Sequence, residues 1–219
     1  MYRLVFITTV LLISSWRLVH AQSPCQEEGF VTLFNGQNLD GWMGATETYV
    51  VENQIIRSVA EKSGNLETMK EYSDFIFRCD FRLTPGSNNG IGLRVPQGQH
   101  AATQGMEIQI IDNTAYRETK LKPYQVHGSV YGLIPARDGA LNPVGEWNHQ
   151  EISCVGKHVT VILNGKTIVD GNIADAYARG PLDDREHPGI ERTSGHLCLL
   201  GHKSVVEFRN LCIKEVVTE

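Results

Sequence analysis

The clearest pattern along the chain is an alternation of apolar and polar side chains over residues 75–83. The sequence there is Phe-Ile-Phe-Arg-Cys-Asp-Phe-Arg-Leu, with an apolar residue at every odd position. Successive side chains of a strand point to opposite faces of a sheet, so this pattern predicts a strand with one buried face. Similar runs predict further strands over residues 49–59, 91–95, 106–111, 151–155, 158–163 and 205–213.

Turn and helix signals fit an all-β chain. Asn164-Gly165 separates the runs 159–163 and 167–169, and Asn-Gly favours a two-residue β-hairpin. No long stretch carries a sustained apolar period of 3.6 residues, and only 173–178 suggests a short turn of helix. Many strands without intervening helices predict a two-sheet antiparallel sandwich, with a closed barrel as the alternative.

Three long segments are expected to be irregular: 114–125, 131–144 and 170–193. They are longer than the usual connections in a compact sandwich. Because binding residues often lie on such loops, we expect these segments to form the walls of a site.

The first 21 residues have the three parts of a secretory signal. Arg3 is followed by the apolar run 4–13, and Val19-His20-Ala21 resembles a cleavage site. Ser14, Ser15 and Arg17 end the apolar run well short of the roughly 20 residues that a membrane anchor needs. We therefore expect a secreted or periplasmic protein cleaved near Ala21, with no membrane span in the mature chain and a single domain over 29–217.

Charge and cysteine content exclude several classes. The 219 residues carry a formal net charge of −5, which argues against nucleic acid as a partner. The five cysteines include no CxxC pair, so a zinc ribbon or redox motif is disfavoured. Cys25, near the mature terminus, is left open to a partner, and export permits a disulfide without making a particular pairing predictable. The other four lie in apolar runs that predict buried thiols: Cys79, Cys154, Cys198 and Cys212.

The run 106–110, Met-Glu-Ile-Gln-Ile, places polar residues on one strand face. If its three apolar residues enter the core, Glu107 and Gln109 must project together from the other side. In the run 90–95, Gly-Ile-Gly-Leu-Arg-Val, the same rule sends Arg94 outward beside two glycines. Strand glycines often mark close approach by a ligand, so the two runs predict a groove floor; the alternative is a surface ion pair between Arg94 and Glu107.

Histidines are the second source of candidate chemistry. His127 and Tyr131 would share a strand face with Ser129, and histidine suits proton transfer near neutral pH. His196 and His202 flank an apolar run and are candidates for the rim of a site. The other histidines of the mature chain are expected to be solvated: His100, His149, His158 and His187.

Several chemistries are disfavoured by missing motifs. The chain has no Gly-x-Ser-x-Gly, no HExxH and no glycine-rich nucleotide loop, so neither a nicotinamide cofactor nor ATP is expected. Glu107-x-Gln109-x-x-Asp112 matches only in part the Glu-x-Asp-x-x-Glu strand of some retaining glycosidases. Because Gln109 stands where the central acid would be, direct hydrolysis by two carboxylates is disfavoured.

Six segments occur in a fixed order between Gly29 and about Glu215: 30–42, Asn89-Gly-Ile-Gly-Leu-Arg94, Gly105-Met-Glu-Ile-Gln-Ile110, Gly145-Glu-Trp-Asn148, Leu163-Asn-Gly-Lys166 and Val206-Glu-Phe-Arg-Asn210. Together they resemble the 3-keto-disaccharide hydrolase family. The resemblance implies an all-β, two-sheet antiparallel jelly-roll sandwich of the concanavalin A-like type. It also implies an exported enzyme that acts on an oligosaccharide or glycoside already oxidised at C3.

A C3 ketone acidifies the C2 hydrogen, so one base suffices for elimination of the C1 substituent. Under the resemblance, Glu107 or His127 is the base, Arg94 supports the enolate, and Gln109, Tyr131 or His202 binds substrate. A divalent cation held by Glu107, Gln109 and His127 is an alternative enolate stabiliser, although no metal-specific spacing occurs. The rival function is a noncatalytic carbohydrate-binding module on a laminin-G-like or concanavalin-like sandwich. The low aromatic content, 8%, favours the enzyme, because a lectin face usually presents a row of aromatic rings.

Overall fold

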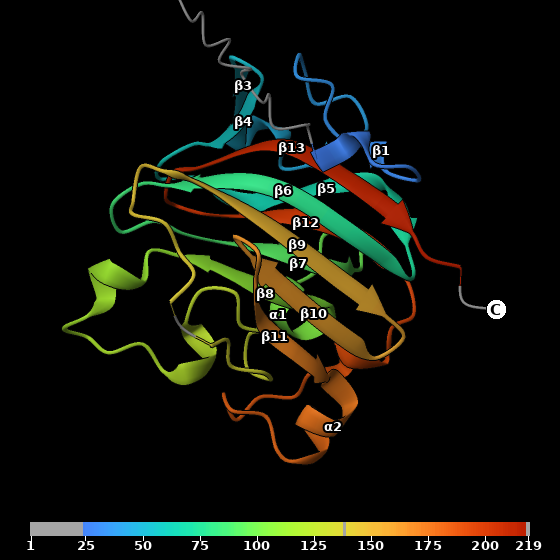
Figure 1. The fold of residues 1–219 in the computed structure, drawn as a ribbon, viewed down its shortest axis with the longest axis vertical. Coiled ribbons are helices and arrows are strands. Elements are labelled where there is room, and N and C mark those ends of the chain that lie inside the picture. The colour runs from blue at the N-terminus through green and yellow to red at the C-terminus, as the bar shows by residue number, and fades with distance from the viewer. Residues whose placement is uncertain (1–23, 138, 218–219) are drawn as a thin grey trace, which may run out of the picture.

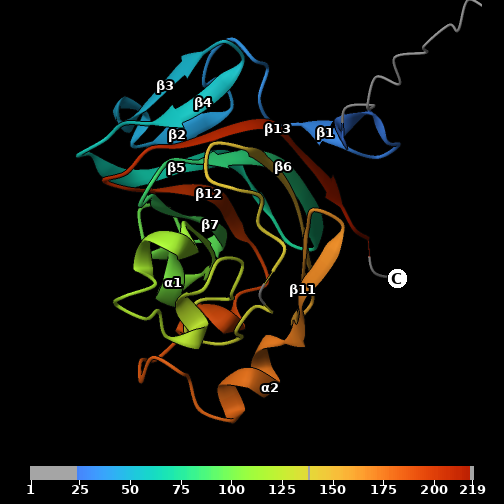
Figure 2. The ribbon, with the colours of Figure 1, turned by 60° about the vertical axis from the view of Figure 1, so that its left-hand side comes forward.

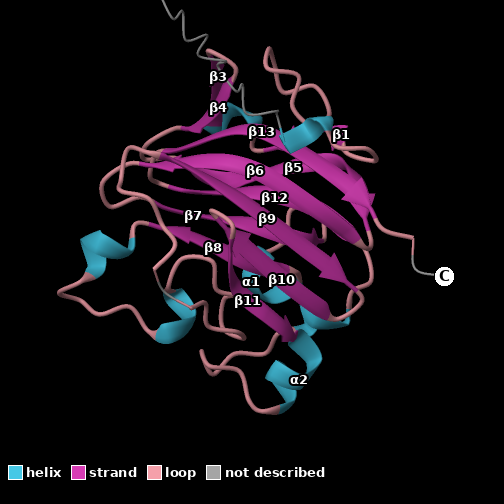
Figure 3. Cartoon of the chain, in the orientation of Figure 1, coloured by secondary structure: helices cyan, strands magenta, loops and turns pink. Residues whose placement is uncertain are grey.

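The computed structural model describes residues 24–137 and 139–217 and consists of two antiparallel β-sheets packed face to face (Figure 1). The predicted leader, residues 1–21, lies outside the described residues. The predicted two-sheet sandwich is confirmed. The long loops and short helices within residues 113–191 lie beside and below the sheets in Figures 1 and 3, whereas the short helices before residue 49 lie above them.

The larger sheet has eight strands. Its order is β11 (Lys166–Asn172), β10 (His158–Leu163), β9 (Trp147–Val155), β6 (Phe75–Leu83), β13 (Val206–Glu215), β4 (Ile55–Ser58) and β3 (Tyr49–Glu52), and β1 (Val31–Thr32) pairs with β13. The smaller sheet has five strands, β2 (Trp42–Gly44), β5 (Ser63–Tyr72), β12 (Gly195–His202), β7 (Asn88–Val95) and β8 (Met106–Ile111). Figure 2 shows α1 (Ala101–Gln104) beside β7, and α2 (Ile173–Ala178) after β11. The short 3-10 helices are η1 (Pro24–Gln26), η2 (Thr46–Thr48), η3 (Asn113–Tyr116), η4 (Pro123–Gln125) and η5 (Pro188–Glu191).

The core lies between the two sheets and follows the predicted alternation. Phe75, Phe77 and Phe81 of β6 are buried there, as are Ile108 and Ile110 of β8. Burying each large side chain stabilises the fold by about 1.5–3 kcal/mol. The outer face of each sheet is therefore left for polar groups.

The local turn predictions are largely confirmed. Asn164 and Gly165 have φ of 49° and 79° and connect β10 to β11, as a two-residue hairpin requires. The predicted helical turn at 173–178 is α2. The segment 49–59 is a hairpin rather than one strand, because Asn53 and Gln54 both adopt positive φ and reverse the chain.

Four strands, β1, β2, β5 and β12, were not predicted, and one predicted loop is shorter than expected. β5 reads Ser-Gly-Asn-Leu-Glu-Thr-Met-Lys-Glu-Tyr, whose polar residues mask its alternation, and β12 was seen only as a short apolar run. Both lie in the smaller sheet and pair with each other. Residues 170–172 belong to β11 rather than to a loop.

Cys25 is joined to Cys212 by a disulfide that ties η1 to β13. The prediction of a buried thiol at Cys212 was therefore wrong, whereas Cys79, Cys154 and Cys198 are free and buried as expected. Cys212 lies in an apolar strand, but the chain entering at η1 brings Cys25 against it. Burial raises the pKa of the Cys154 thiol to about 11, so this thiol is not reactive at neutral pH.

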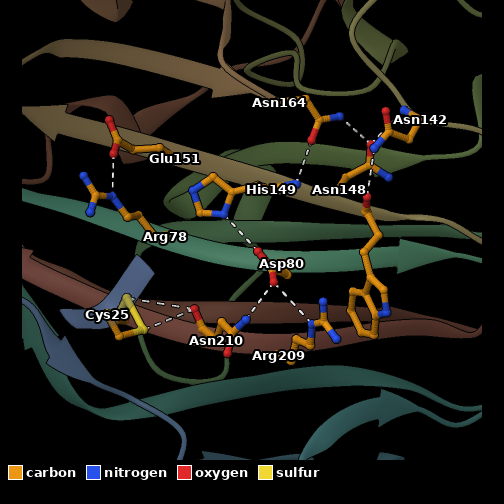
Figure 4. A network of polar contacts seen from close by, with 12 residues as sticks. Cys25, Arg78, Asp80, Asn142, Asn148, His149, Glu151, Asn164, Arg209 and Asn210 are labelled. Atoms are coloured by element: carbon orange, nitrogen blue, oxygen red, sulfur yellow. Dashed lines mark hydrogen bonds and ion pairs between the residues drawn. A yellow bond between two sulfur atoms is a disulfide. The ribbon is translucent and has the colours of Figure 1, made fainter. Parts of the chain in front are cut away.

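The outer face of the larger sheet carries a network of polar side chains beside this disulfide (Figure 4). Asp80 accepts hydrogen bonds from Asn210 at 2.7 Å and Arg209 at 3.2 Å, and lies 2.9 Å from Nδ1 of His149. Burial alone would raise the pKa of Asp80, but these hydrogen bonds and charges together lower it. The network joins β6, β9 and β13, and its polar groups bond to one another. None of the candidate catalytic residues belongs to it.

Candidate active site

A pocket of about 570 Å³ lies on the outer face of the smaller sheet. Its volume falls within the range typical of small-molecule sites. Glu107 and Gln109 of β8 and Leu200 of β12 contribute to the pocket from the sheet. The walls come from α1, from the loop containing η3 and η4, and from the segments around Tyr131 and Arg185. Parts of all three predicted wall loops thus line the pocket.

Glu107 faces the pocket because the side chains of β8 alternate between the two faces of the sheet, as predicted. Met106, Ile108 and Ile110 enter the core, which turns Glu107 and Gln109 to the opposite face. In the ladder with β7, Gly92 lies opposite Glu107 and Gly90 opposite Gln109. Burial raises the pKa of the Glu107 carboxyl to about 7. A carboxyl with this pKa is suited to accept a proton near neutral pH.

Gln109 is buried and also lines the pocket. Its Oε1 has no hydrogen-bond partner among the described residues. Its main chain is fixed by the neighbouring segment, since the Gln109 amide donates to Ser129 O at 3.0 Å and the Gly128 amide donates to Gln109 O at 2.7 Å. A buried, unsatisfied acceptor is costly unless a partner arrives, so Gln109 is ready to accept a hydrogen bond from a ligand hydroxyl.

Tyr131 and His202 reach the same pocket, as the sequence analysis expected. The Tyr131 amide donates to Glu107 O at 2.9 Å, which places Tyr131 directly beside the β8 edge. Its hydroxyl accepts a hydrogen bond from Nε2 of Gln125 at 3.4 Å. His202, at the end of β12, is exposed on the rim.

Arg94 does not reach the pocket, contrary to the expected groove floor. Its φ is +52°, and this bulge breaks the alternation, so that Val95 rather than Arg94 packs on the pocket side of the sheet. The guanidinium is 1% exposed and forms an ion pair with Asp74 at 2.7 Å. It also donates to the carbonyls of Ser73 at 2.8 Å and Gly156 at 2.7 Å. Arg94 therefore holds loops together, and neither an enolate contact nor an ion pair with Glu107 is formed.

His127 lies in the interior rather than in the pocket. Gly128, with φ of +82°, turns the chain immediately after His127. The imidazole stacks on the Phe81 ring, with centroids 5.0 Å apart. Its Nδ1 accepts a hydrogen bond from the Ile111 amide, and its Nε2 lies 3.1 Å from Oε1 of Gln150. Burial lowers the pKa of His127 to about 4. The ring is neutral, fully engaged and remote from the pocket, so it is not positioned as the base.

Two other histidines were also misplaced by the sequence analysis. His187 is completely buried instead of solvated, between the Ala102 carbonyl at 2.8 Å and Asp183 at 2.9 Å. His196 is buried against Thr68 O at 2.8 Å and does not form the rim. In both cases a segment distant in sequence supplies the covering partner.

The sequence analysis missed several polar residues of the pocket. Asn65, Asn88 and Asn89 come from β5 and β7. Asn65 was missed because β5 was not recognised, whereas Asn89 stood in the motif that carries the family resemblance. Lys120 and Arg185 lie in loops that were expected to form walls, but no sequence pattern singled them out.

The proposed metal-ligand set is not assembled, because His127 points away from Glu107 and Gln109. No group of three or more histidine, cysteine or acidic side chains suited to a metal occurs in the described part of the chain. Within residues 24–137 and 139–217, no helix is long and apolar enough to cross a bilayer.

Residues 29–214 match the family model of the 3-keto-alpha-glucoside-1,2-lyase-like domain. The chain belongs to this family. A 3-keto-disaccharide hydrolase of Bacteroides thetaiotaomicron is 21% identical over 88% of this chain and 80% of its own length. Family membership confirms both the resemblance found in the sequence and the predicted enzyme class, a hydrolase.

Solved structures confirm the sandwich. A provisionally named glycosyl hydrolase of Parabacteroides distasonis is 28% identical, with a TM-score of 0.75 over 85% of this chain and 99% of that one. A carbohydrate-binding module of Bacillus subtilis has a TM-score of 0.51 at 12% identity, over 85% of this chain and 96% of that one. The second likeness shows the fold alone.

Proposed function

We propose that this protein cleaves glycosides whose sugar carries a ketone at C3, with Glu107 as the general base. The observation that carries the proposal is the Glu107 carboxyl, the single acidic group of the described pocket lining. Its pKa is about 7, and two glycines of β7 lie across from its strand. The names of the family and of the Bacteroides thetaiotaomicron relative support a 3-keto-glucoside or 3-keto-disaccharide as the substrate class.

The chemistry needs one base and one proton donor. Glu107 removes the C2 proton, and the electron pair of that bond forms the C3 enolate. The enolate then re-forms the ketone and expels the C1 oxygen, giving a C1–C2 double bond and a leaving group that takes up a proton. Water adds at C1 and a proton returns to C2, so the net reaction is hydrolysis. A general base of this kind contributes about 10²–10⁴-fold to the rate.

Direct displacement at C1 fits the pocket less well. Glycosidases that act in this way place two carboxyl groups about 5–9.5 Å apart across the scissile bond. Glu107 is the only acidic residue among the described residues that line the pocket. Asp112 is occupied in a turn, where it accepts from the amides of Gly86 and Thr114 at 2.9 Å each.

The other pocket residues have roles that follow from their chemistry. Gln109 Oε1 lacks a partner and accepts from a sugar hydroxyl. In the proposed reaction the Tyr131 hydroxyl gives a proton to the leaving oxygen, a role supported by its position in the pocket lining beside the Glu107 strand. His202 contacts substrate at the rim.

Export to an oxidising compartment is part of the proposal. The Cys25–Cys212 disulfide supports it, because stable disulfides are rare in reducing cytoplasm. N-terminal sequencing of the protein from its native host tests this point: a start near Gln22 supports export, and an intact Met1 contradicts it.

The reaction is tested with the purified protein, a 3-keto-glucoside and its unoxidised parent, with and without a chelator. We expect turnover of the ketone alone, with deuterium at C2 of the product in heavy water. Glu107→Gln should lose about 10²–10⁴-fold in rate, whereas Glu118→Gln, an exposed wall-loop residue outside the pocket lining, should not. Full retention of the C2 hydrogen, or equal turnover of the parent, would reject the mechanism.

A further inference from the structure

The pocket lining carries more positive than negative charge. Lys120, from the loop after η3, and Arg185, from the loop after α2, line the same pocket together with His100 and His202. The only acidic lining residue in the described chain is Glu107. The whole chain has the opposite balance, with 25 acidic and 20 basic residues. The pocket is thus a local basic region in an acidic protein.

Neither cation is neutralised within the described part of the chain. Lys120 and Arg185 form no ion pair there, unlike several arginines of the two sheets. Arg94 pairs with Asp74 and Arg82 with Glu207, at 2.7 and 2.5 Å. The two pocket cations are therefore free to bind an anion.

The backbone that carries Arg185 is held in place by a buried pair. Asp183 accepts from the Arg185 amide at 3.3 Å and lies 2.9 Å from Nε2 of His187. His187 in turn contacts the Ala102 carbonyl of α1 at 2.8 Å. The loop is thus fixed to α1, which also lines the pocket, and binding requires little further ordering of its backbone.

The position of the cations relative to Glu107 indicates which part of a substrate they meet. A base must contact the C2 hydrogen, so the ketone ring lies beside Glu107 on the sheet. Lys120 and Arg185 are exposed residues of the same lining, so a C1 substituent that extends from the ring toward solvent on their side of the pocket meets them. Resting on the proposed function, we infer that the natural substrates carry an anionic group, a carboxylate or a sulfate or phosphate ester, on the C1 substituent.

Both attraction and geometry favour such a group. A guanidinium binds carboxylate, sulfate or phosphate oxygens through two parallel hydrogen bonds, and a lysine adds a point charge. Interactions at an exposed mouth are screened by salt. The preference should therefore weaken as ionic strength rises.

The test compares 4-carboxyphenyl and 4-carboxamidophenyl 3-keto-α-glucosides, which match in shape and differ in charge. At low salt, kcat/KM of the carboxylate should exceed that of the carboxamide by about tenfold, and the ratio should fall toward one in about 0.5 M salt. Lys120→Met and Arg185→Leu should each reduce the ratio several-fold. The control variants Lys122→Met and Arg179→Leu, close in sequence but outside the pocket lining, should keep it.

A ratio of one for the unmodified protein at low salt overturns the inference while leaving the proposed function intact. Equal losses on both substrates in Lys120→Met and Arg185→Leu overturn it as well, because they indicate a role that does not depend on substrate charge. If the unmodified protein cleaves neither ketone, the proposed function itself fails. A sulfate or phosphate ester in place of the carboxylate identifies which anion is preferred.

Discussion

Gly90 provides the space that the Glu107 carboxylate occupies. A Cβ at Gly90 would overlap Oε1 of Glu107 and would lie 2.9 Å from Cδ1 of Leu200. The glycine thus belongs to the site through its missing side chain. It allows the Glu107 side chain on β8 to pack against the backbone of β7, where burial raises the pKa of its carboxyl.

Gly90→Ala should displace the Glu107 side chain and lower kcat by at least about tenfold, because a misplaced base can lose 10²-fold in rate. Glu107 would also meet more solvent, so the pKa read from the rate profile should fall from about 7 toward the ordinary 4.5. Steady-state kinetics over pH measure both effects. Unchanged kcat with an unchanged profile would show that Gly90 does not shape the site.

The pH dependence of the rate should reflect the ionisation of Glu107. We expect kcat/KM to rise with pH through about 7, because the base works only when ionised.

The free energy of unfolding should change with pH in the opposite direction. The folded pKa lies above the usual 4.5, so the native state binds more protons, and its stabilising contribution is complete below about pH 4.5 and lost as pH rises through 7. Urea unfolding at pH 4.5 and 8 measures this slope, which Glu107→Gln should reduce; the same slope in the variant would contradict the assignment.

Arg94→Met should act on stability rather than on chemistry. It removes the ion pair with Asp74 and leaves the carbonyls of Ser73 and Gly156 without their donor. Loss of one partner of a buried pair costs about 3–5 kcal/mol. Denaturant unfolding measures this loss, and kcat per folded molecule should stay near that of the unmodified protein. A large fall in kcat with normal stability would return Arg94 to the active site.

His127→Ala should also destabilise the fold, by about 2–4 kcal/mol, because it opens a cavity and leaves Gln150 and the Ile111 amide unpaired. His127→Asn should recover part of this loss, since its amide oxygen can replace the Nδ1 acceptor. The folded pKa of His127 is about 4 rather than 6.5, so its stabilising contribution is lost as pH falls from 6.5 to 4. Thermal unfolding over this range should show a shallower pH dependence in the asparagine variant. A loss of rate without a loss of stability in either variant would instead support His127 as the base.

Local sequence determined the sandwich, the hairpin at Asn164-Gly165 and the placement of Glu107 and Gln109 on one strand face. Each of these follows from a period of two or from the backbone preference of two turn residues, and both are properties of a few adjacent positions. The family resemblance was likewise visible in short segments in a fixed order.

Tertiary structure decided which of the candidate residues share the pocket. Arg94 and His127 were expected on the groove by strict alternation, but positive φ at Arg94 and at Gly128 breaks the alternation and sends both side chains to buried partners. Asp74, 20 residues from Arg94, and Gln150, 23 residues from His127, supply those partners. Arg185 reaches the pocket because Asp183 and His187 fix its loop to α1, and Lys120 reaches it from the separate loop after η3. Such contacts depend on packing between distant segments, which no local pattern encodes.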